Sequence, residues 1–491
     1  MGTGIRRIIY SRSTFLLLVL VLIRLPFFFR DYVDRDESTF ILMGQSVADG
    51  YLPYDFLWDL KPPLLFYLFG LIEFIFPDSL VAIRVFGTLV IFGSALLLIA
   101  IARLAELKNG FLVAFVYVLL SSLFGSVQGV MSEHIAVFFM LAALYFFLKR
   151  KSVPTLFLSG LFLGCALLCK MNYAYAIPLL LALYAVLYGK ELPLRKIVKH
   201  MLAMVGGILL SIFLVAIPFL ASNRFELFVD SVFLAPYEYG QALHLSIGQK
   251  IQKTWWIIVV GLIVSFLSIR RMAPEQREAA WAFVIVVMAT IYTFFSSATV
   301  NGHYLLQVYP FLALLLLGIV TGRDYRPRMA WIIIVVILVS GEAMLEYYRL
   351  GKHVVATGKF YNGSSLIAIE EINKKGLENE AVFFADYHIG YWFIDRYPLT
   401  KSTTHPSSLA RPFLFKYFGN LKTSSMEELK YLFEEVRPRV VVSKNRHLSF
   451  FEEGSSENDY FRHVKGRYYQ PVFEDSVKRI YIWERNVVNP N

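Results

Sequence analysis

Long apolar runs separated by short polar loops dominate the first 350 residues of the chain. A helix needs about 20 mainly apolar residues to cross a bilayer, and about eleven runs approach or reach that length. The pattern therefore predicts an α-helical polytopic membrane protein. The expected spans are 13–29, 80–102, 111–128, 133–148, 154–169, 172–188, 201–221, 254–269, 279–297, 303–321 and 329–347.

A shorter apolar stretch, 64–76, precedes the second span. It is too short to cross comfortably, so we expect an interfacial or re-entrant helix. The N-terminal run Phe15 to Ile23 follows three arginines and resembles a signal sequence, but no small-residue cleavage site follows it. We therefore expect it to be a retained first span with a cytoplasmic N-terminus.

Charge in the loops alternates along the chain. Every second loop is basic, and the loops between them carry the acids. Because basic loops stay on the cytoplasmic side, this alternation predicts that the segment 30–79 is the first outer loop. The net charge of +11 is then a feature of topology rather than a sign of nucleic-acid binding. The basic loops hold Arg103 and Lys108; Lys149 to Lys151; Lys190, Arg195, Lys196 and Lys199; Arg270, Arg271 and Arg277; and Arg323, Arg326 and Arg328.

The composition changes near residue 350, where long apolar runs stop and charge rises. We predict a transmembrane domain over 1–350 and a small extracytoplasmic α/β domain over 351–491, on the periplasmic side of a cytoplasmic (inner) membrane. A helix with a capping box is expected to start at Ser425. Short β-rich runs stand at 381–385, 439–442 and 479–483. Cys165 and Cys169 are one helical turn apart in a span and are expected only to pack, because neither disulfide nor zinc spacing is available.

Candidate chemistry begins in the first outer loop. Asp36 and Glu37 form a carboxylate pair, although Asp36 could simply cap the amphipathic helix that follows. Lys61 precedes Pro62 and Pro63, which rigidify the chain and stop a preceding helix. A lysine there could hold the phosphate of a membrane lipid, or only meet lipid headgroups.

Further polar residues reach the same membrane face from other spans. Ionisable residues at that depth indicate a functional site by default. For each, a structural role such as topological anchoring or a solvated span boundary stays open. These residues are Arg84, a possible phosphate contact; Glu133 and His134, a cavity acid or metal ligand; Lys170; and His303 with Tyr304.

In this order the residues resemble the membrane glycosyltransferases of the GT-C fold, of the protein mannosyltransferase and aminoarabinose transferase type (glycosyltransferase families 39 and 83). The resemblance covers about residues 15 to 320. It rests on Arg24, Asp36-Glu37, Lys61-Pro62-Pro63-Leu64, Arg84, Glu133, Lys170 and His303-Tyr304-Leu305-Leu306 with Pro310. Some aminoarabinose-type relatives carry an acid immediately before the lysine, where this chain has Leu60. That departure argues against assuming aminoarabinose or lipid A.

The resemblance implies an inverting enzyme that takes a monosaccharide from a polyprenyl-phosphate donor, such as an undecaprenyl phosphate sugar. Asp36 would be the general base and Glu37 would support it or bind the acceptor. Lys61, with Arg84 or His303, would hold the leaving phosphate. The acceptor would be lipid A, O-antigen, another cell-surface glycan or a protein. No cofactor is certain, and a divalent metal ion stays possible.

Two other classes of function remain open. A flippase or transporter for a lipid-linked glycan would need charged residues along inward-facing spans, and few are seen. A polyprenyl-diphosphate glycan ligase or polymerase would be expected to use arginines in a large outer loop. The 222–253 loop is instead aromatic and mixed in charge, with Phe233, Tyr237 and Tyr239. That loop could clamp the acceptor or lipid, or simply anchor at the interface.

Overall fold

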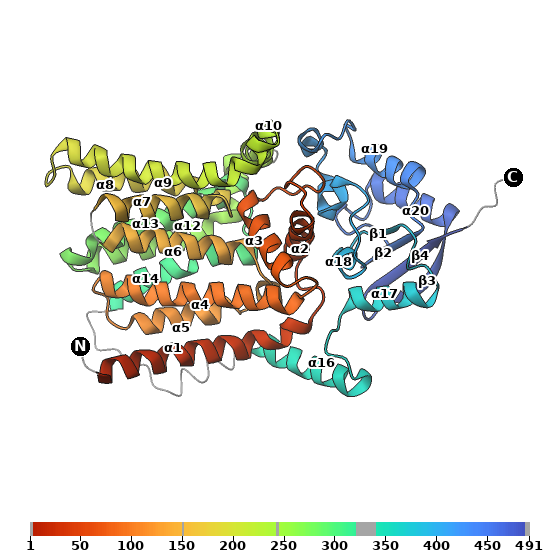
Figure 1. The fold of residues 1–491 in the computed structure, drawn as a ribbon, viewed down its shortest axis with the longest axis horizontal. Coiled ribbons are helices and arrows are strands. Elements are labelled where there is room, and N and C mark those ends of the chain that lie inside the picture. Colours follow the sequence, from red (N-terminus) through yellow and green to blue (C-terminus); the bar gives the residue numbers. More distant parts are fainter. Residues whose placement is uncertain (1–2, 150–151, 242–244, 321–339, 487–491) are drawn as a thin grey trace.

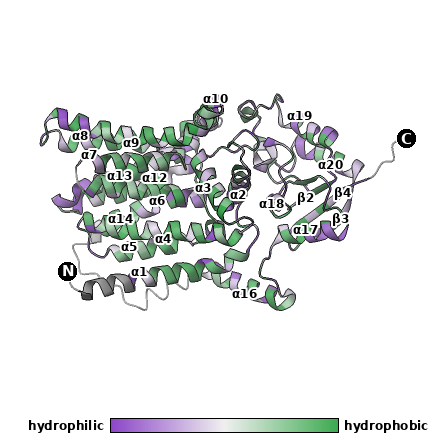
Figure 2. Cartoon of the chain, viewed as in Figure 1, coloured by the Kyte–Doolittle hydropathy of each residue, from purple (hydrophilic) through white to green (hydrophobic). Residues whose placement is uncertain are grey.

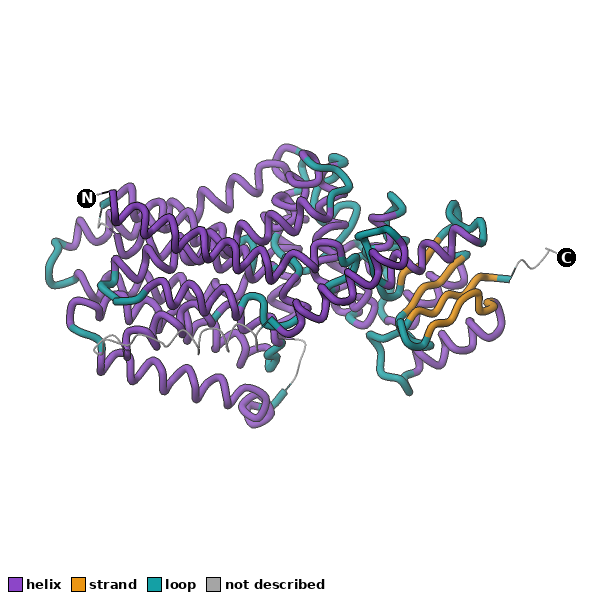
Figure 3. The backbone as a smooth tube through the Cα atoms, turned by 90° about the horizontal axis from the view of Figure 1, so that it is seen from below, coloured by secondary structure: helices purple, strands orange, loops and turns teal. Residues whose placement is uncertain are grey.

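The computed structural model describes residues 3–149, 152–241, 245–320 and 340–486. A bundle of long helices occupies one end of the elongated molecule, and a small β-sheet with its helices occupies the other (Figure 1). A view turned by 90° shows the same two parts side by side along the long axis (Figure 3).

Seven helical segments in the described residues are long and apolar enough to cross a membrane. They are Arg12–Phe29 (in α1, Thr3–Arg24, and η1, Leu25–Phe29), Leu80–Leu104 (α4), Ser132–Lys149 (α6), Met171–Tyr188 (η3, Met171–Tyr175, and α8, Ala176–Tyr188), Leu194–Ala221 (α9), Ile247–Arg271 (α12) and Pro274–Ser297 (η5, Pro274–Gln276, and α13, Arg277–Ser297). Shorter apolar helices lie beside them: α3 (Pro63–Ile75), α5 (Gly110–Leu120), α7 (Val153–Leu167) and α14 (Tyr309–Val320).

The polytopic helical fold class predicted from the sequence is confirmed. Ten of the predicted spans coincide with these long or short helices, and three of them are shorter than predicted because turns or 3₁₀ segments interrupt the apolar run. One such segment is η2 (Gly125–Gln128), within the predicted span 111–128. The predicted span 329–347 lies largely outside the described residues, and α16 (Gly341–Thr357) covers its last part.

Helices α2 (Arg35–Ala48) and α3 lie at the end of the bundle that faces the sheet (Figure 1). They pack closely because Gly44 has no side chain: a Cβ there would lie 2.6 Å from the Cβ of Phe69. At the opposite end of the bundle, hydrophilic residues gather in the turns between helices (Figure 2). These hydrophilic turns and the helices α2 and α3 thus lie at opposite ends of the bundle.

The sheet contains four strands in the order β1-β2-β4-β3. Strand β1 (Val382–Phe384) runs parallel to β2 (Val440–Ser443), whereas β4 (Ile480–Arg485) is antiparallel to β2 and to β3 (Tyr469–Asp475). Successive side chains of a strand point to opposite faces. Accordingly, Phe383, Val441 and Trp483 join one buried cluster, with α19 (Ser425–Lys430), η10 (Tyr431–Val436) and α20 (Ser456–Tyr468). The alternate residues face α17 (Ser364–Lys374) and α18 (Gly390–Phe393) in the main core.

Three of these strands match the β-rich runs in the sequence, and β3 was missed. Pro471 and several exposed polar residues interrupt its apolar pattern, as is usual for a strand at the edge of a sheet. The predicted helix start at Ser425 is confirmed, but the residue that caps the helix lies one position earlier. The N-cap of α19 is Ser424, whose side chain accepts a hydrogen bond from the backbone N–H of Glu427.

Polar contacts dock the sheet-bearing part onto the segment 30–79. Arg35 forms an ion pair of 3.0 Å with Asp386, and the indole of Trp392 donates to Glu73 over 3.2 Å. Asp31 accepts hydrogen bonds from the backbone N–H of Tyr32 and, over 2.9 Å, from that of Leu366. Apart from the contact with Tyr32, these contacts join residues that are more than 300 positions apart in the chain.

Asp31 makes this docking sensitive to pH. Burial raises the pKa of Asp31 to about 6, whereas an unfolded aspartate titrates near 3.9. Between these values the folded form keeps a proton that the unfolded form releases, so stability falls as pH rises from about 4 to about 6. We expect the free energy of unfolding to fall by ~3 kcal/mol over this window.

Asp31→Asn should remove that part of the pH dependence, measured as the difference in apparent melting temperature between variant and wild type at each pH. If the melting temperatures of the variant and the wild type depend on pH in the same way, Asp31 does not cause this pH dependence.

Candidate active site

A cavity of about 430 Å³ lies where the helical bundle meets the sheet-bearing part. Its walls come from the segment 30–79, from η3, from α11 (Ala235–Gln241) and the π-helical η4 (Asp230–Leu234), from the end of α13, and from η6 (Gly302–Gln307). The part of the chain after residue 400 closes the remaining side. The volume is within the range of sites that hold small molecules.

Asp36 lies in the wall of this cavity, and its carboxylate contacts Lys61 and His405. Its Oδ2 accepts from the Lys61 ammonium over 3.0 Å, and its Oδ1 lies 3.3 Å from Nε2 of His405. Asp34 is the residue that caps α2: its carboxylate accepts from the backbone N–H of Asp36 over 2.9 Å. The capping alternative for Asp36 therefore does not apply, and its carboxylate is available to the cavity.

The backbone around Lys61 is held from both sides. Its N–H donates to Asp59 over 3.1 Å, and its carbonyl accepts from the hydroxyl of Tyr54 over 2.7 Å. The two prolines that follow set the chain direction into α3, where Pro62 is the N-cap and Pro63 the first residue. The ammonium also lies 5.4 Å from the centre of the Phe40 ring. Lys61 is thereby fixed beside Asp36.

Burial and charge act in opposite directions on this pair. Burial raises the pKa of Asp36, but Lys61 and His405 outweigh it, and the pKa of Asp36 lies well below its ordinary value. Burial lowers the pKa of Lys61, but Asp36 and Asp59 outweigh it and raise the pKa above its ordinary value. Burial and the neighbouring Asp36 raise the pKa of Asp34 to about 7. Asp36 and Lys61 are therefore a fully ionised pair at neutral pH.

Glu37 and Arg84 form a second, fully buried ion pair outside the cavity lining. Both Glu37 oxygens accept from Arg84 at 2.7 Å, and one also accepts from the backbone N–H of Val130 at 2.7 Å. Gly129 permits this approach, since a Cβ there would lie 2.9 Å from the carboxylate. Arg24 donates to the carbonyls of residues 127–129 and holds the same turn. The structure thus joins Glu37 to Arg84 and keeps both away from the substrate space.

Lys170, His303 and Tyr304 also line the cavity. The ammonium of Lys170 lies 2.6 Å from the Glu133 carboxylate and 4.7 Å from the centre of the Tyr304 ring. Glu133 itself is fully buried behind Lys170 and does not line the cavity. It neutralises the charge of Lys170 from the side away from the cavity.

His134 is also fully buried and does not line the cavity. Its Nδ1 accepts from the backbone N–H of Met131 over 3.3 Å. Over the described residues, no three His, Cys, Asp or Glu side chains gather as they would to hold a metal ion.

Sequence reasoning missed two basic residues of the cavity wall, His405 and Arg411. Both lie in a stretch of 3₁₀ turns, η7 (Lys401–Thr403), η8 (Pro406–Ala410) and η9 (Pro412–Phe418), which has no periodic pattern. His405 is aligned by the hydroxyl of Ser407, 2.7 Å from Nδ1. The aromatic residues noted in the 222–253 loop, Phe233, Tyr237 and Tyr239, also line the cavity. The only local signal was that His405 and Arg411 each directly precede a proline.

One protein family matches the chain in sequence. The model of the dolichyl-phosphate-mannose-protein mannosyltransferase family matches residues 60–220, which include Lys61, Arg84, Glu133 and Lys170. No curated protein matches in sequence. The match confirms the predicted resemblance to membrane glycosyltransferases and the predicted enzyme class.

Solved structures match the fold over the whole chain. ArnT from Cupriavidus metallidurans bound to undecaprenyl phosphate is 14% identical, with a TM-score of 0.59, and each chain is covered to 100%. The apo form of that ArnT is 13% identical, with a TM-score of 0.55 and 98% coverage of both chains. The archaeal oligosaccharyltransferase AglB from Archaeoglobus fulgidus matches more weakly: 12% identity, a TM-score of 0.49, and coverage of 96% of this chain and 73% of AglB. The ArnT matches confirm the predicted GT-C fold of a multi-pass membrane protein.

Proposed function

We propose that this membrane glycosyltransferase moves a monosaccharide from a polyprenyl-phosphate donor to a hydroxyl acceptor, with inversion, in the cavity around Asp36 and Lys61. The observation that carries the proposal is the 3.0 Å pair of carboxylate and ammonium in a cavity at one end of a membrane-spanning bundle. The reaction needs both groups: a base for the acceptor and a cation for the leaving phosphate.

In the proposed reaction the acceptor oxygen attacks the anomeric carbon while the bond from that carbon to the phosphate oxygen breaks. The electron pair of the broken bond goes to the lipid phosphate, and the hydroxyl proton goes to Asp36. The phosphate leaves as a stable anion, so no general acid is needed. Lys61 offsets the charge that develops on it. Inversion follows because attack and departure occur on opposite faces of the sugar.

Lys61 must change partners for this to happen. In the structure its ammonium is paired with Asp36 at 3.0 Å. We infer that the donor phosphate attracts the ammonium away from the carboxylate. Because Lys61 is the main cause of the depressed pKa of Asp36, its departure makes Asp36 a stronger base only when donor is bound. His405 remains on the other oxygen and keeps the carboxylate oriented.

The remaining lining suits a sugar. Tyr175, Tyr237, Tyr239 and Tyr304 offer aromatic faces, and Asn172 and Asn301 offer amide groups for sugar hydroxyls. Glu37 acts as a positioning residue, because through Arg84 and Val130 it fixes the start of α2 next to Asp36.

The proposed orientation places the cavity on the outer face of the cytoplasmic membrane. The basic turns at the far end of the bundle would then lie in the cytoplasm, in accordance with the positive-inside rule. The domain division at about residue 350 and the acceptor classes named above (lipid A, O-antigen, another surface glycan or protein) form part of the same proposal.

Lys61→Met tests the phosphate role without knowledge of the sugar, because undecaprenyl phosphate is the shared leaving group of such donors. Losing one charge-assisted contact should weaken its binding ~10- to 100-fold. The measurement is a titration of undecaprenyl phosphate into the full chain in nanodiscs. Lys416→Met is the matched control, since Lys416 forms a surface pair with Glu238 outside the cavity lining.

Equal lipid affinity of Lys61→Met and wild type would contradict the phosphate role of Lys61. If the wild type binds no polyprenyl monophosphate but binds a polyprenyl-diphosphate glycan, the donor class is wrong and the ligase alternative is supported.

A further inference from the structure

Arg411 brings a second cationic group to the cavity from the far end of the chain. It stands between η8 and η9 and is half-buried. Its side chain lines the same cavity as Asp36 and Lys61. The cavity wall is therefore incomplete without the sheet-bearing part of the molecule.

Arg411 differs from the cavity lysines in its pairing. Lys61 is neutralised by Asp36 at 3.0 Å, and Lys170 by Glu133 at 2.6 Å. Within the described ranges, no carboxylate forms an ion pair with Arg411. Its guanidinium instead lies 5.0 Å from the centre of the Tyr239 ring. A cation–π contact of this kind uses the face of the ring and leaves the N–H groups of the guanidinium available for a ligand.

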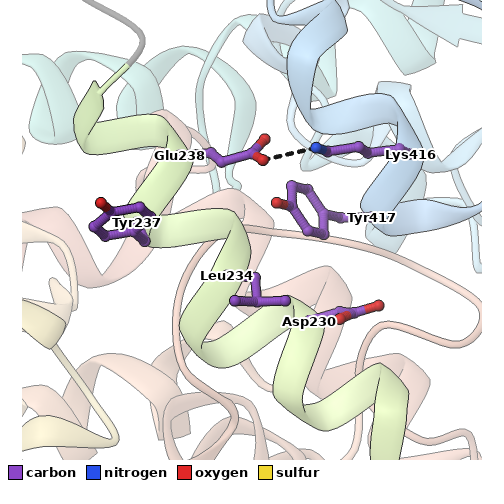
Figure 4. Close-up of a pocket in the computed structure, with 6 residues that line it drawn as sticks. All are labelled: Asp230, Leu234, Tyr237, Glu238, Lys416 and Tyr417. Atoms are coloured by element: carbon purple, nitrogen blue, oxygen red, sulfur yellow. Dashed lines mark hydrogen bonds and ion pairs between the residues drawn. The ribbon is translucent and has the colours of Figure 1, made fainter.

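The acidic residue of α11, the helix that carries Tyr239, already forms an ion pair elsewhere. Glu238 lies next to Tyr239 in α11, but its carboxylate pairs with Lys416 at 2.6 Å and faces a shallow surface groove (Figure 4). Tyr237 lines both this groove and the cavity, so α11 forms the wall between them. The Glu238–Lys416 pair closes the outside of that wall, and the Arg411–Tyr239 pair faces inward.

We propose that Arg411, oriented by Tyr239, binds an oxyanion, a phosphate or a carboxylate, carried by the acceptor; this rests on the function proposed above. A half-buried guanidinium without a counter-ion is costly, and a bound anion would offset that cost. The planar fork of arginine matches a phosphate or carboxylate in a bidentate manner, as a lysine cannot.

The position of Arg411 favours the acceptor over the donor. The donor phosphate must lie beside the anomeric carbon, next to Asp36, and Lys61 is the cation held there. Arg411 belongs to the part of the chain that covers the end of the bundle. An acceptor that enters between the bundle and this cover would pass Arg411 before its hydroxyl reaches Asp36.

Phosphorus NMR can test the site with simple probes. The full chain in nanodiscs is saturated with undecaprenyl phosphate and then titrated with inorganic phosphate, whose signal is distinct from that of the lipid. We expect Arg411→Gln to weaken inorganic phosphate binding ~10-fold, the value for one charge-assisted contact. Tyr239→Leu should weaken it as well, and Tyr239→Phe should not, because the ring is kept.

Competition with acetate distinguishes an acceptor that carries a carboxylate from one that carries a phosphate. Acetate that displaces inorganic phosphate at comparable concentration would indicate a carboxylate acceptor, and weak displacement would indicate a phosphorylated one. Lys416→Gln is the matched control and should bind phosphate like the wild type, since its pair lies outside the cavity lining.

Other outcomes would overturn the inference. Unchanged phosphate binding in Arg411→Gln would show that Arg411 does not bind the anion. A loss of undecaprenyl phosphate affinity in Arg411→Gln as large as in Lys61→Met would assign Arg411 to the donor instead. If the wild type fails to bind undecaprenyl phosphate but inorganic phosphate binding still depends on Arg411, the anion site stands and the proposed function fails.

Discussion

Asp36→Asn is expected to lower the rate of sugar transfer ~100- to 10,000-fold, the usual contribution of a general base. The amide keeps the size of the side chain but cannot accept the hydroxyl proton. The measurement is single-turnover transfer by the full chain in nanodiscs, with a panel of polyprenyl-phosphate monosaccharides as donors. Full activity of Asp36→Asn on a donor that the wild type uses would show that Asp36 is not the base.

The same variant separates a catalytic defect from a folding defect. Asp36→Asn removes the carboxylate that competes for the Lys61 ammonium at 3.0 Å. Its affinity for undecaprenyl phosphate should therefore rise while transfer falls. Unchanged or weaker lipid binding would contradict the exchange of partners by Lys61. Asp55→Asn is a suitable control, because Asp55 lies in the same segment but is more exposed and contacts Arg224 at 3.5 Å.

Glu37→Ala is expected to destabilise the protein by ~3–5 kcal/mol, the cost of leaving one charge of a buried pair without its partner. Arg84 is fully buried, and both oxygens of Glu37 hold it at 2.7 Å. The loss would appear as a large fall in apparent melting temperature in detergent. Glu238→Ala, which breaks an exposed pair, should cost no more than ~1 kcal/mol.

A double variant makes this prediction specific to charge. Glu37→Leu with Arg84→Met replaces the pair by apolar side chains, so it should recover most of the stability that Glu37→Ala loses. If the double variant is as unstable as Glu37→Ala, the cost comes from lost packing or from the freed N–H of Val130. If Glu37→Ala is as stable as the wild type, the pair does not support the start of α2.

Much of the candidate site could be predicted because its signals are local. Lys170, His303 and Tyr304 stand next to span ends, and Asp36 and Lys61 lie in the loop between the first two spans. Both positions confine a residue to one membrane face. Five of the nine residues singled out in the sequence line the cavity for this reason. The other four are Glu37, Arg84, Glu133 and His134, which share those signals but are buried behind the wall.

These local signals could not predict the direction in which a side chain points. Glu37 follows Asp36 directly, yet a helix turns successive residues by about 100°, so one faces the cavity and the other faces Arg84. Which of the two faces the cavity depends on how α2 is set against α3 and α4. Close packing at Gly44 and at Gly129 fixes this orientation of α2.

The sequence alone determined the apolar spans, the alternation of charge between loops and three of the four strands of the small sheet, because each is a pattern over neighbouring residues. Only the tertiary structure decided which charges neutralise each other and which face the cavity. His405 meets Asp36 across 369 positions, and Arg411 reaches the same space. Contacts over such separations arise from packing of the whole chain, which no local pattern encodes.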